Sequence, residues 1–145
     1  MSIRTIALTI RPTAEQAAAL ERLQRQFNAA CNAISEVAWR VREFAQFELH
    51  KLVYGEIRSR FGLLAQYVIR AIAVVAHSYK ADKTTCHTFR LDAPVVLDTP
   101  RLYTLRATLA CITTLEGRLA IPLAIGGKQR EQLHAASKVA EADLI

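Results

Sequence analysis

The chain has 145 residues, 52% of them hydrophobic, and a formal net charge of +6. This composition supports a hydrophobic core and excludes an intrinsically disordered chain. No apolar run approaches the ~20 residues of a membrane span, and the N-terminus has no apolar signal-peptide core. The cysteines Cys31, Cys86 and Cys111 are far apart and odd in number. They are typical of a reducing compartment, so we expect a cytoplasmic protein.

The positive charge is spread along the chain. Residues 1–12 have two basic and no acidic side chains, residues 13–82 nine and seven, and residues 83–145 eight and six, so each part carries +2. A basic protein attracts polyanions whatever its fold. Because the sequence has no basic run, a nucleic-acid site requires the fold to gather separate residues on one surface.

The N-terminal region predicts a strand followed by a long helix. Residues 3–10 alternate imperfectly between apolar and polar side chains, and Pro12 ends the strand. Thr13 and Gln16 have the spacing of a capping box. Apolar residues then recur at heptad spacing and predict one amphipathic helix that fades after Phe47. They form two rows, Leu20, Phe27, Ile34 and Val41, and Leu23, Ala30, Val37 and Phe44.

Two more helices are predicted before the composition changes. One covers about Leu49–Arg60, with Gly62 as a C-cap and Gly55 as a weak point. The other covers about Leu64–Ala81. Its apolar face consists of Leu64, Val68, Ile72, Val75 and Tyr79. We therefore expect residues 13–83 to form a three-helix bundle.

After Lys83 the pattern favours strands and turns. Residues 97–101 (LDTPR) predict a turn, and Ala107–Leu115 and Leu119–Ile125 predict a β-hairpin around LEGR. A short helix over Lys128–Ala136 and a last strand within residues 138–145 follow. Strands thus flank a helical block, which gives an α+β fold. We predict that residues 3–10 pair with strands from residues 95–125, so that residues 1–12 and 84–145 form one discontinuous β domain.

No arrangement of residues predicts catalysis or metal binding. The sequence has no CxxC or HxxxH spacing, no phosphate-binding P-loop and no obvious pair of convergent carboxylates. Cys31 and Cys111 lie in apolar patterns, which is typical of core thiols. We therefore expect no catalytic residue, no metal site, no cofactor and no enzymatic activity in this chain.

Basic and aromatic residues are interleaved around the ends of the second and third predicted helices. The basic ones are Arg58, Arg60, Arg70, Lys80 and Lys83, and the aromatic ones are Tyr67, Tyr79, Phe89 and Tyr103. Phosphate contacts from Arg and Lys, together with stacking on Tyr, are the requirements of an RNA-binding groove. The alternative is that the charged residues only solvate helix faces while the tyrosines pack in the core.

Three segments carry a resemblance to a known family. They are ALTIRPTAEQAAAL, YGEIRSRFGLLAQYVIRAIAVVAHSYK and TTLEGRLAIPLAIGGKQREQL. Their order and spacing, over nearly the whole chain, resemble the N-terminal part of TnpB. TnpB is the transposon-encoded RNA-guided DNA endonuclease related to type V CRISPR effectors.

The resemblance implies an antiparallel β-barrel of the oligonucleotide-binding type, the wedge domain, with the inserted helices as the recognition lobe. Together these parts hold guide RNA and its heteroduplex with target DNA. Arg11 to Thr13 would lie at the junction of barrel and lobe, and Arg58, Arg60, Arg70 and Lys80 would face the nucleic acid. The family's catalytic carboxylates and zinc ribbon are absent, so we expect a fragment, either a truncated copy or a partial gene.

A second hypothesis is a helical interaction module without nucleic acid. In that case the chain would self-associate through the Leu20–Phe44 seam of the first helix. The two hypotheses predict different surfaces. A contiguous basic groove lined by tyrosines favours nucleic-acid binding, whereas an apolar stripe left exposed along the first helix favours dimerisation.

Overall fold

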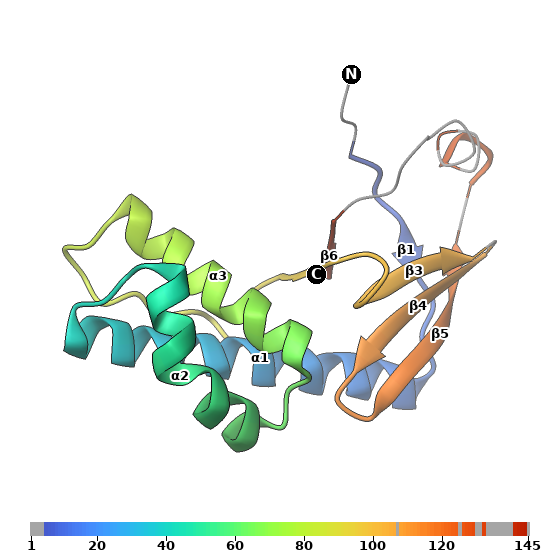
Figure 1. Cartoon of the computed structure of the whole chain (residues 1–145). Helices are drawn as coiled ribbons and strands as arrows, with labels where there is room; N and C mark the ends of the chain where they lie inside the picture. The colour runs from blue at the N-terminus through green and yellow to red at the C-terminus, as the bar shows by residue number, and fades with distance from the viewer. Residues whose placement is uncertain (1–4, 107, 125, 130–131, 133–140, 145) are drawn as a thin grey trace.

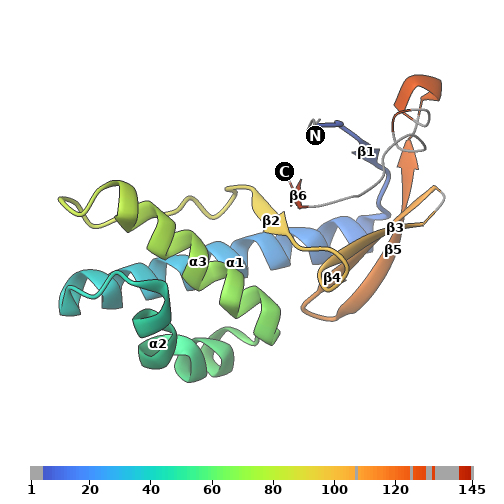
Figure 2. The same ribbon diagram turned by 45° about the horizontal axis from the view of Figure 1, so that its top comes forward.

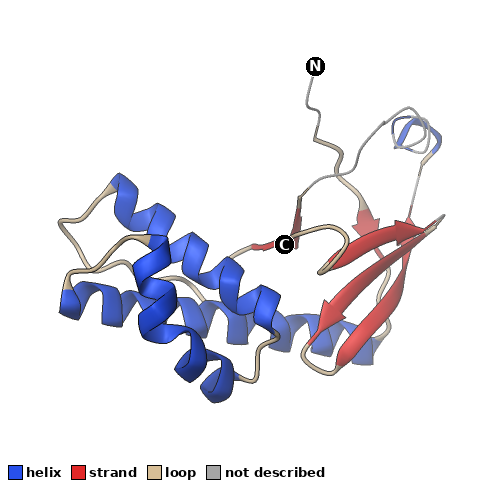
Figure 3. Cartoon of the chain, viewed as in Figure 1, coloured by secondary structure: helices blue, strands red, loops and turns tan. Residues whose placement is uncertain are grey.

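The computed structural model describes residues 5–106, 108–124, 126–129, 132 and 141–144. Helices gather at one end of the molecule and strands at the other (Figures 1 and 3). The helices are α1 (Ala14–Val41), α2 (Gln46–Phe61) and α3 (Ala65–Ala81). The strands are β1 (Thr9–Ile10), β2 (Val95–Leu97), β3 (Tyr103–Arg106), β4 (Leu109–Thr114), β5 (Gly117–Ala124) and β6 (Ala142–Leu144). The α+β class predicted from the sequence is confirmed.

The N-terminal strand pairs across the whole helical block, as predicted. Thr9 lies opposite Ala124 and Ile10 opposite Leu123 in an antiparallel ladder, and the Arg11 amide donates to the Pro122 carbonyl at 2.7 Å. Of the predicted strand 3–10, residues 3 and 4 lie outside the described residues, and among residues 5–10 only Thr9 and Ile10 are in the ladder. Thr9 faces Ala124, the last residue of β5 that the structure describes.

The predicted hairpin is confirmed, and its turn is tight. β4 and β5 pair antiparallel, with Thr114 opposite Gly117, whose φ of 130° is accessible to glycine. β3 lies along the other side of β4, which gives the order β1-β5-β4-β3. Over the described residues this sheet is open, with β1 and β3 at its edges, and the closed barrel stays a prediction. The strands β2 and β6 form a separate antiparallel pair.

Parts of two other predicted elements lie outside the described residues. Of the predicted helix Lys128–Ala136, residues 128, 129 and 132 are described, and all are helical. Of the predicted last strand, 138–145, the residues 142–144 form β6, while 138–140 and 145 are not described.

Local chemistry sets the helix ends. The Thr13 hydroxyl accepts from the Gln16 amide at 3.1 Å, and the Thr13 amide donates to the Gln16 side chain at 3.0 Å, so the capping box is present. Helix α1 ends at Val41, earlier than predicted, because Arg42 adopts a left-handed conformation (φ 56°). The Arg42 guanidinium then lies 4.5 Å from the Trp39 ring centroid and 5.1 Å from that of Phe44.

Helix α2 ends at Gly62, as predicted, and its φ of 62° is the left-handed conformation of a C-cap. The helix runs through Gly55 without a break, so the expected weak point does not divide it. The predicted apolar face of α3 is buried at Val68, Ile72, Val75 and Tyr79, but Leu64 is 47% exposed because it is the N-cap.

The apolar rows of α1 are buried inside this chain. Leu23, Phe27, Ala30 and Ile34 are at most 2% exposed, and they belong to one core cluster with residues of α2, α3 and the strands. The predicted self-association through the α1 seam is therefore wrong, because other helices and strands of the same chain cover these residues. The same cluster joins the helical and strand regions, so the division into domains at residues 12/13 and 83/84 remains a prediction.

Polar side chains of α1 hold the connection between α3 and β2. Residues 87–93, here called the return segment, run antiparallel along α1 (Figure 2). The polar ladder consists of Gln24, Asn28, Asn32 and Ser35, which donate to the backbone carbonyls of residues 93, 91, 89 and 87. The Phe89 amide also donates to Asn32 Oδ1 at 2.6 Å.

The repeat lengths of a helix and an extended chain explain this ladder. One i to i+4 step along a helix advances about 6.0 Å, and two residues of extended chain advance about 6.6 Å. Side chains spaced three or four apart on α1 can therefore reach the carbonyls of His87, Phe89 and Leu91. The segment then turns, and Gln24 donates to the adjacent carbonyls of Asp92 and Ala93. Asn28 is 2% exposed and Ser35 fully buried, so their polar atoms need these partners.

We predict that Asn32→Ala lowers the free energy of unfolding by about 1–3 kcal/mol. The substitution leaves the amide and carbonyl of Phe89 without their partner. Urea unfolding followed by circular dichroism measures the change. Glu36→Ala, at an exposed position of the same helix, is the matched control. Equal stability of the two variants would contradict the structural role of the ladder.

Candidate nucleic-acid interface

An open groove of about 880 Å³ runs over the outward face of α3. Its other walls are the connection between α1 and α2 on one side, and β2 with the residue before β6 on the other. Apolar side chains, including Phe44, Val74 and Val96, line part of it. The charged and titratable lining residues are Arg70, His77, Lys80, Lys83 and Glu141. We call this surface the α3 groove.

Helical spacing brings the basic residues of α3 together. Arg70, His77 and Lys80 lie seven and then three residues apart, so they share one helix face, and Lys83 follows the helix end. The formal charges in the groove are three positive (Arg70, Lys80, Lys83) and one negative (Glu141), which gives +2. Lys80 and Lys83 are exposed, and within the described residues neither ammonium forms a salt bridge.

Arg70 differs from the two lysines because carboxylates already hold it. Its Nη1 lies 3.4 Å from Asp98 Oδ1 and 3.4 Å from Glu141 Oε1, and its side chain is 20% exposed. Asp98 also accepts from Gln66 Nε2 at 2.6 Å. Arg70 therefore links α3 to the loop after β2 and to the residue before β6, and much of its charge is balanced.

The buried Nε of Arg70 is a hydrogen-bond donor without an acceptor among the residues that the structure describes. An unpaired buried donor is costly, so the ion pairs on Nη1 must outweigh that cost for the side chain to stay in place. Arg70 is best understood as part of the groove wall, whereas Lys80 and Lys83 are the groups open to a ligand.

The other predicted residues lie outside the groove. Arg58 and Arg60 are exposed near the C-terminal end of α2, and Arg58 is about 18 Å along the helix axis from Gln46 at the groove. Arg11 is exposed where β5 meets α1. The Thr13 hydroxyl is occupied by the helix cap, so its role here is structural.

The expected tyrosine lining is wrong. Tyr67 and Tyr79 are fully buried, and Tyr103 is 4% exposed. Tyr67 Oη donates to the Thr113 carbonyl at 2.5 Å, and Tyr79 Oη lies 2.8 Å from Ser35 Oγ. Burial raises the pKa of Tyr67 and of Tyr103. Phe89 is half-buried in the return segment. Tyr67 and Tyr79 can lie in the core because each of their hydroxyls has a hydrogen-bond partner there, as buried hydroxyls require.

Sequence reasoning missed His77 and the apolar floor at Ala73 and Val74. Both follow from the helical period, because residues 70, 73, 74, 77 and 80 are the positions opposite the buried face of α3. The walls of the groove were not predictable in the same way, since they come from distant parts of the chain.

The described residues form no cluster of three or more His, Cys, Asp or Glu that could hold a metal ion. Cys31 is buried, and burial raises the pKa of its thiol from 9.0 to about 12, so it is protonated at neutral pH. Cys86 is exposed and Cys111 half-buried.

We predict that the thiols react in the order of their exposure. With a disulfide reagent at neutral pH, Cys86 should react first and Cys111 more slowly, because thiolate character and access both limit the rate. Cys31 should react only after denaturation. Cys86→Ser should remove the fast phase in a stopped-flow absorbance assay. Rapid labelling of Cys31 in the native protein would contradict its burial.

No protein-family model matches the chain, and a search of curated proteins finds no match. None of the helices in the described parts of the chain is long and apolar enough to cross a membrane.

We predict that Arg70 contributes more to the free energy of unfolding than Lys80 does. Arg70→Gln should lower the free energy of unfolding by about 1–3 kcal/mol, because it removes charged hydrogen-bonded contacts to Asp98 and Glu141. Lys80→Gln should change it by less than about 0.5 kcal/mol. Urea unfolding of the two variants provides the comparison. If both variants lost the same free energy of unfolding, Arg70 would not fix the groove wall.

Proposed function

We propose that the chain is a nucleic-acid-binding module whose α3 groove receives backbone phosphates. The observation that carries this proposal is the pair of exposed ammonium groups, Lys80 and Lys83, at a groove with a formal charge of +2. Ammonium groups without a carboxylate partner are suited to phosphate, and their attraction to polyanions does not require base-specific contacts.

The dimensions of the groove favour a polymer over a small anion. From Arg70 to Lys80 the outward face of α3 extends about 15 Å along the helix axis. That length exceeds a single phosphate and is comparable with several steps of a nucleic-acid strand, which advances 3.4 Å per base in B-DNA. The groove is open along its side, so a nucleic-acid strand could enter it from the side and would not have to be threaded in from one end.

We further propose the role that the resemblance to TnpB implies. The sheet and the β2–β6 pair would be the wedge-like, oligonucleotide-binding barrel, and α1–α3 would be the recognition-like helices. The module would hold guide RNA and the guide–target heteroduplex of a transposon-encoded RNA-guided DNA endonuclease. The pairing of β1 with β5 across three helices supports this proposal, because it is the discontinuous connectivity that the resemblance requires.

The test is the salt dependence of RNA binding. Fluorescence anisotropy with a labelled structured RNA should show log K falling linearly with log salt. Lys80→Ala with Lys83→Ala should reduce the slope by about 1.4–1.8, which corresponds to two phosphates at 0.7–0.9 each. Arg25→Ala with Arg40→Ala, at two exposed positions of α1, removes the same net charge and is the control. Wild-type protein without salt-dependent RNA binding would overturn the proposal.

A further inference from the structure

The outward face of α2 carries a regular stripe of aromatic and basic residues. Leu49, Val53 and Ile57 form the buried side of this helix. At 100° per residue, residues spaced four, seven and eleven positions after Phe47 lie in one stripe that flanks this buried side. They are Phe47, Lys51, Tyr54 and Arg58, which we call the α2 stripe. Aromatic and basic side chains alternate along it.

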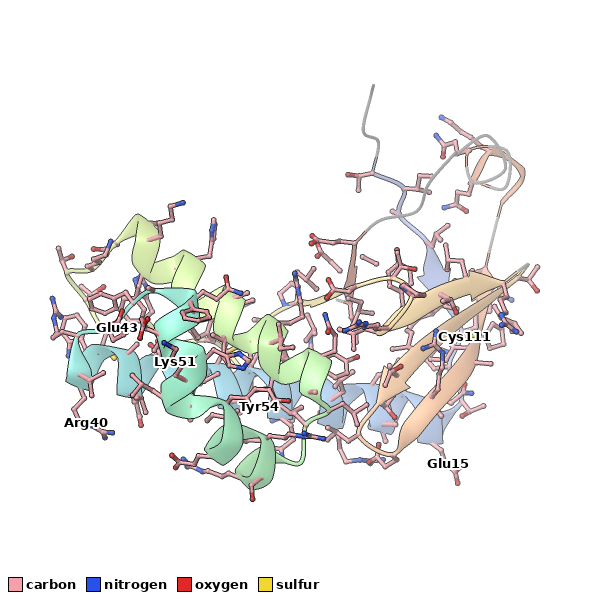
Figure 4. The ribbon with its side chains drawn as sticks, viewed as in Figure 1. Glu15, Arg40, Glu43, Lys51, Tyr54 and Cys111 are labelled. Carbon is pink, nitrogen blue, oxygen red and sulfur yellow. The ribbon has the colours of Figure 1, made fainter. Side chains whose placement is uncertain are left out.

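Three side chains of the stripe, Phe47, Lys51 and Arg58, are exposed, whereas Tyr54 is partly buried and packs against the core cluster. Phe47 is 71% exposed, the most exposed of the large hydrophobic side chains described. Lys51 Nζ lies 4.4 Å from the Phe47 ring centroid, and the Tyr54 ring stacks on His50 at 4.5 Å. Figure 4 shows Lys51 and Tyr54 following one another along α2. Glu48 flanks the stripe, 3.5 Å from Lys51.

Gly55 adds an independent observation on the same helix. It is helical and exposed, its φ is not positive, and a Cβ there would meet no atom of the described residues within 4 Å. Within the described part of the chain, neither backbone conformation nor packing requires glycine, which destabilises a helix interior relative to alanine. A partner backbone that approaches α2 closely between Tyr54 and Arg58 would require it.

We infer that the α2 stripe binds an unpaired stretch of RNA, with a base stacked on the exposed ring of Phe47 and phosphates at Lys51 and Arg58. Stacking on aromatic rings combined with basic side chains is how proteins hold single strands, because the faces of duplex bases are already covered. The charge fits, since phosphate can replace Glu48 as the partner of Lys51. This inference rests on the proposed function and extends it.

Continuity with the α3 groove supports the same ligand. Gln46, the first residue of α2, lines that groove, and Phe47 follows it directly. A strand leaving the groove would therefore meet the stripe at its N-terminal end and follow it towards Arg58. In this arrangement Arg58 acts at the far end of the stripe, which explains how it can contact RNA without lying in the groove.

The test compares single and double strands. The probe is a labelled oligouridine of about 12 nucleotides, within the range of single-strand site sizes, and a duplex of the same length. Phe47→Ala should weaken oligouridine binding by about 5- to 100-fold, with the salt slope unchanged because stacking releases no counterion. Leu52→Ala, which also removes an exposed apolar side chain from α2 (54% exposed), is the control and should change oligouridine affinity less than about 2-fold.

Gly55→Ala separates binding from folding. Alanine favours the helix, so this variant should have a higher melting temperature than the wild type and still bind oligouridine more weakly. If Phe47→Ala and Gly55→Ala bind as the wild type does, while the Lys80 and Lys83 variant is weakened, the inference is overturned and the proposed function stands. If the wild type binds no RNA, both are overturned.

Discussion

The return segment takes its hydrogen bonds from side chains of α1 instead of from a neighbouring strand. Gln24, Asn28, Asn32 and Ser35 satisfy its carbonyls, and this contact leads the chain from the end of α3 back along α1. The segment ends where β2 begins, so its course determines where β2 and β6 lie relative to α3. The groove wall formed by Val96 and Glu141 depends on that placement. The polar ladder is therefore the constraint from which the candidate interface follows.

The predicted parts of the fold are those that local chemistry decides. The Thr13–Gln16 cap, the C-cap at Gly62 and the hairpin around Leu115–Glu116 each depend on residues adjacent in sequence. The pairing of residues 3–10 with some strand from residues 95–125 was predictable, because an isolated strand needs a partner, but the choice of β5 was not. In contrast, the polar ladder gave no signal in the sequence, since polar residues on a helix are ordinarily assigned to solvent.

The candidate site was predictable only as a set of residue types. Helical periodicity places Arg70 and Lys80 on one face, but the sequence does not reveal that Asp98 and Glu141 bind one of them and leave the other open. Those carboxylates come from distant segments. The tyrosines were misread for a related reason. Tyr67 and Tyr79 have buried hydroxyl partners that only the tertiary fold supplies, Thr113 for one and Ser35 for the other.

The residue spacing of α1 matches that of the return segment, and this match limits insertions and deletions in homologous sequences. Ordinary surface loops tolerate insertions and deletions. Between His87 and Leu91, losing one residue would turn the backbone groups that bind Asn32 and Ser35 away from α1 and each side chain to the opposite side. Length changes there should occur two residues at a time, together with a shift of one turn in the α1 asparagines. Homologues of this chain should therefore show substitutions in this connection and hardly any gaps.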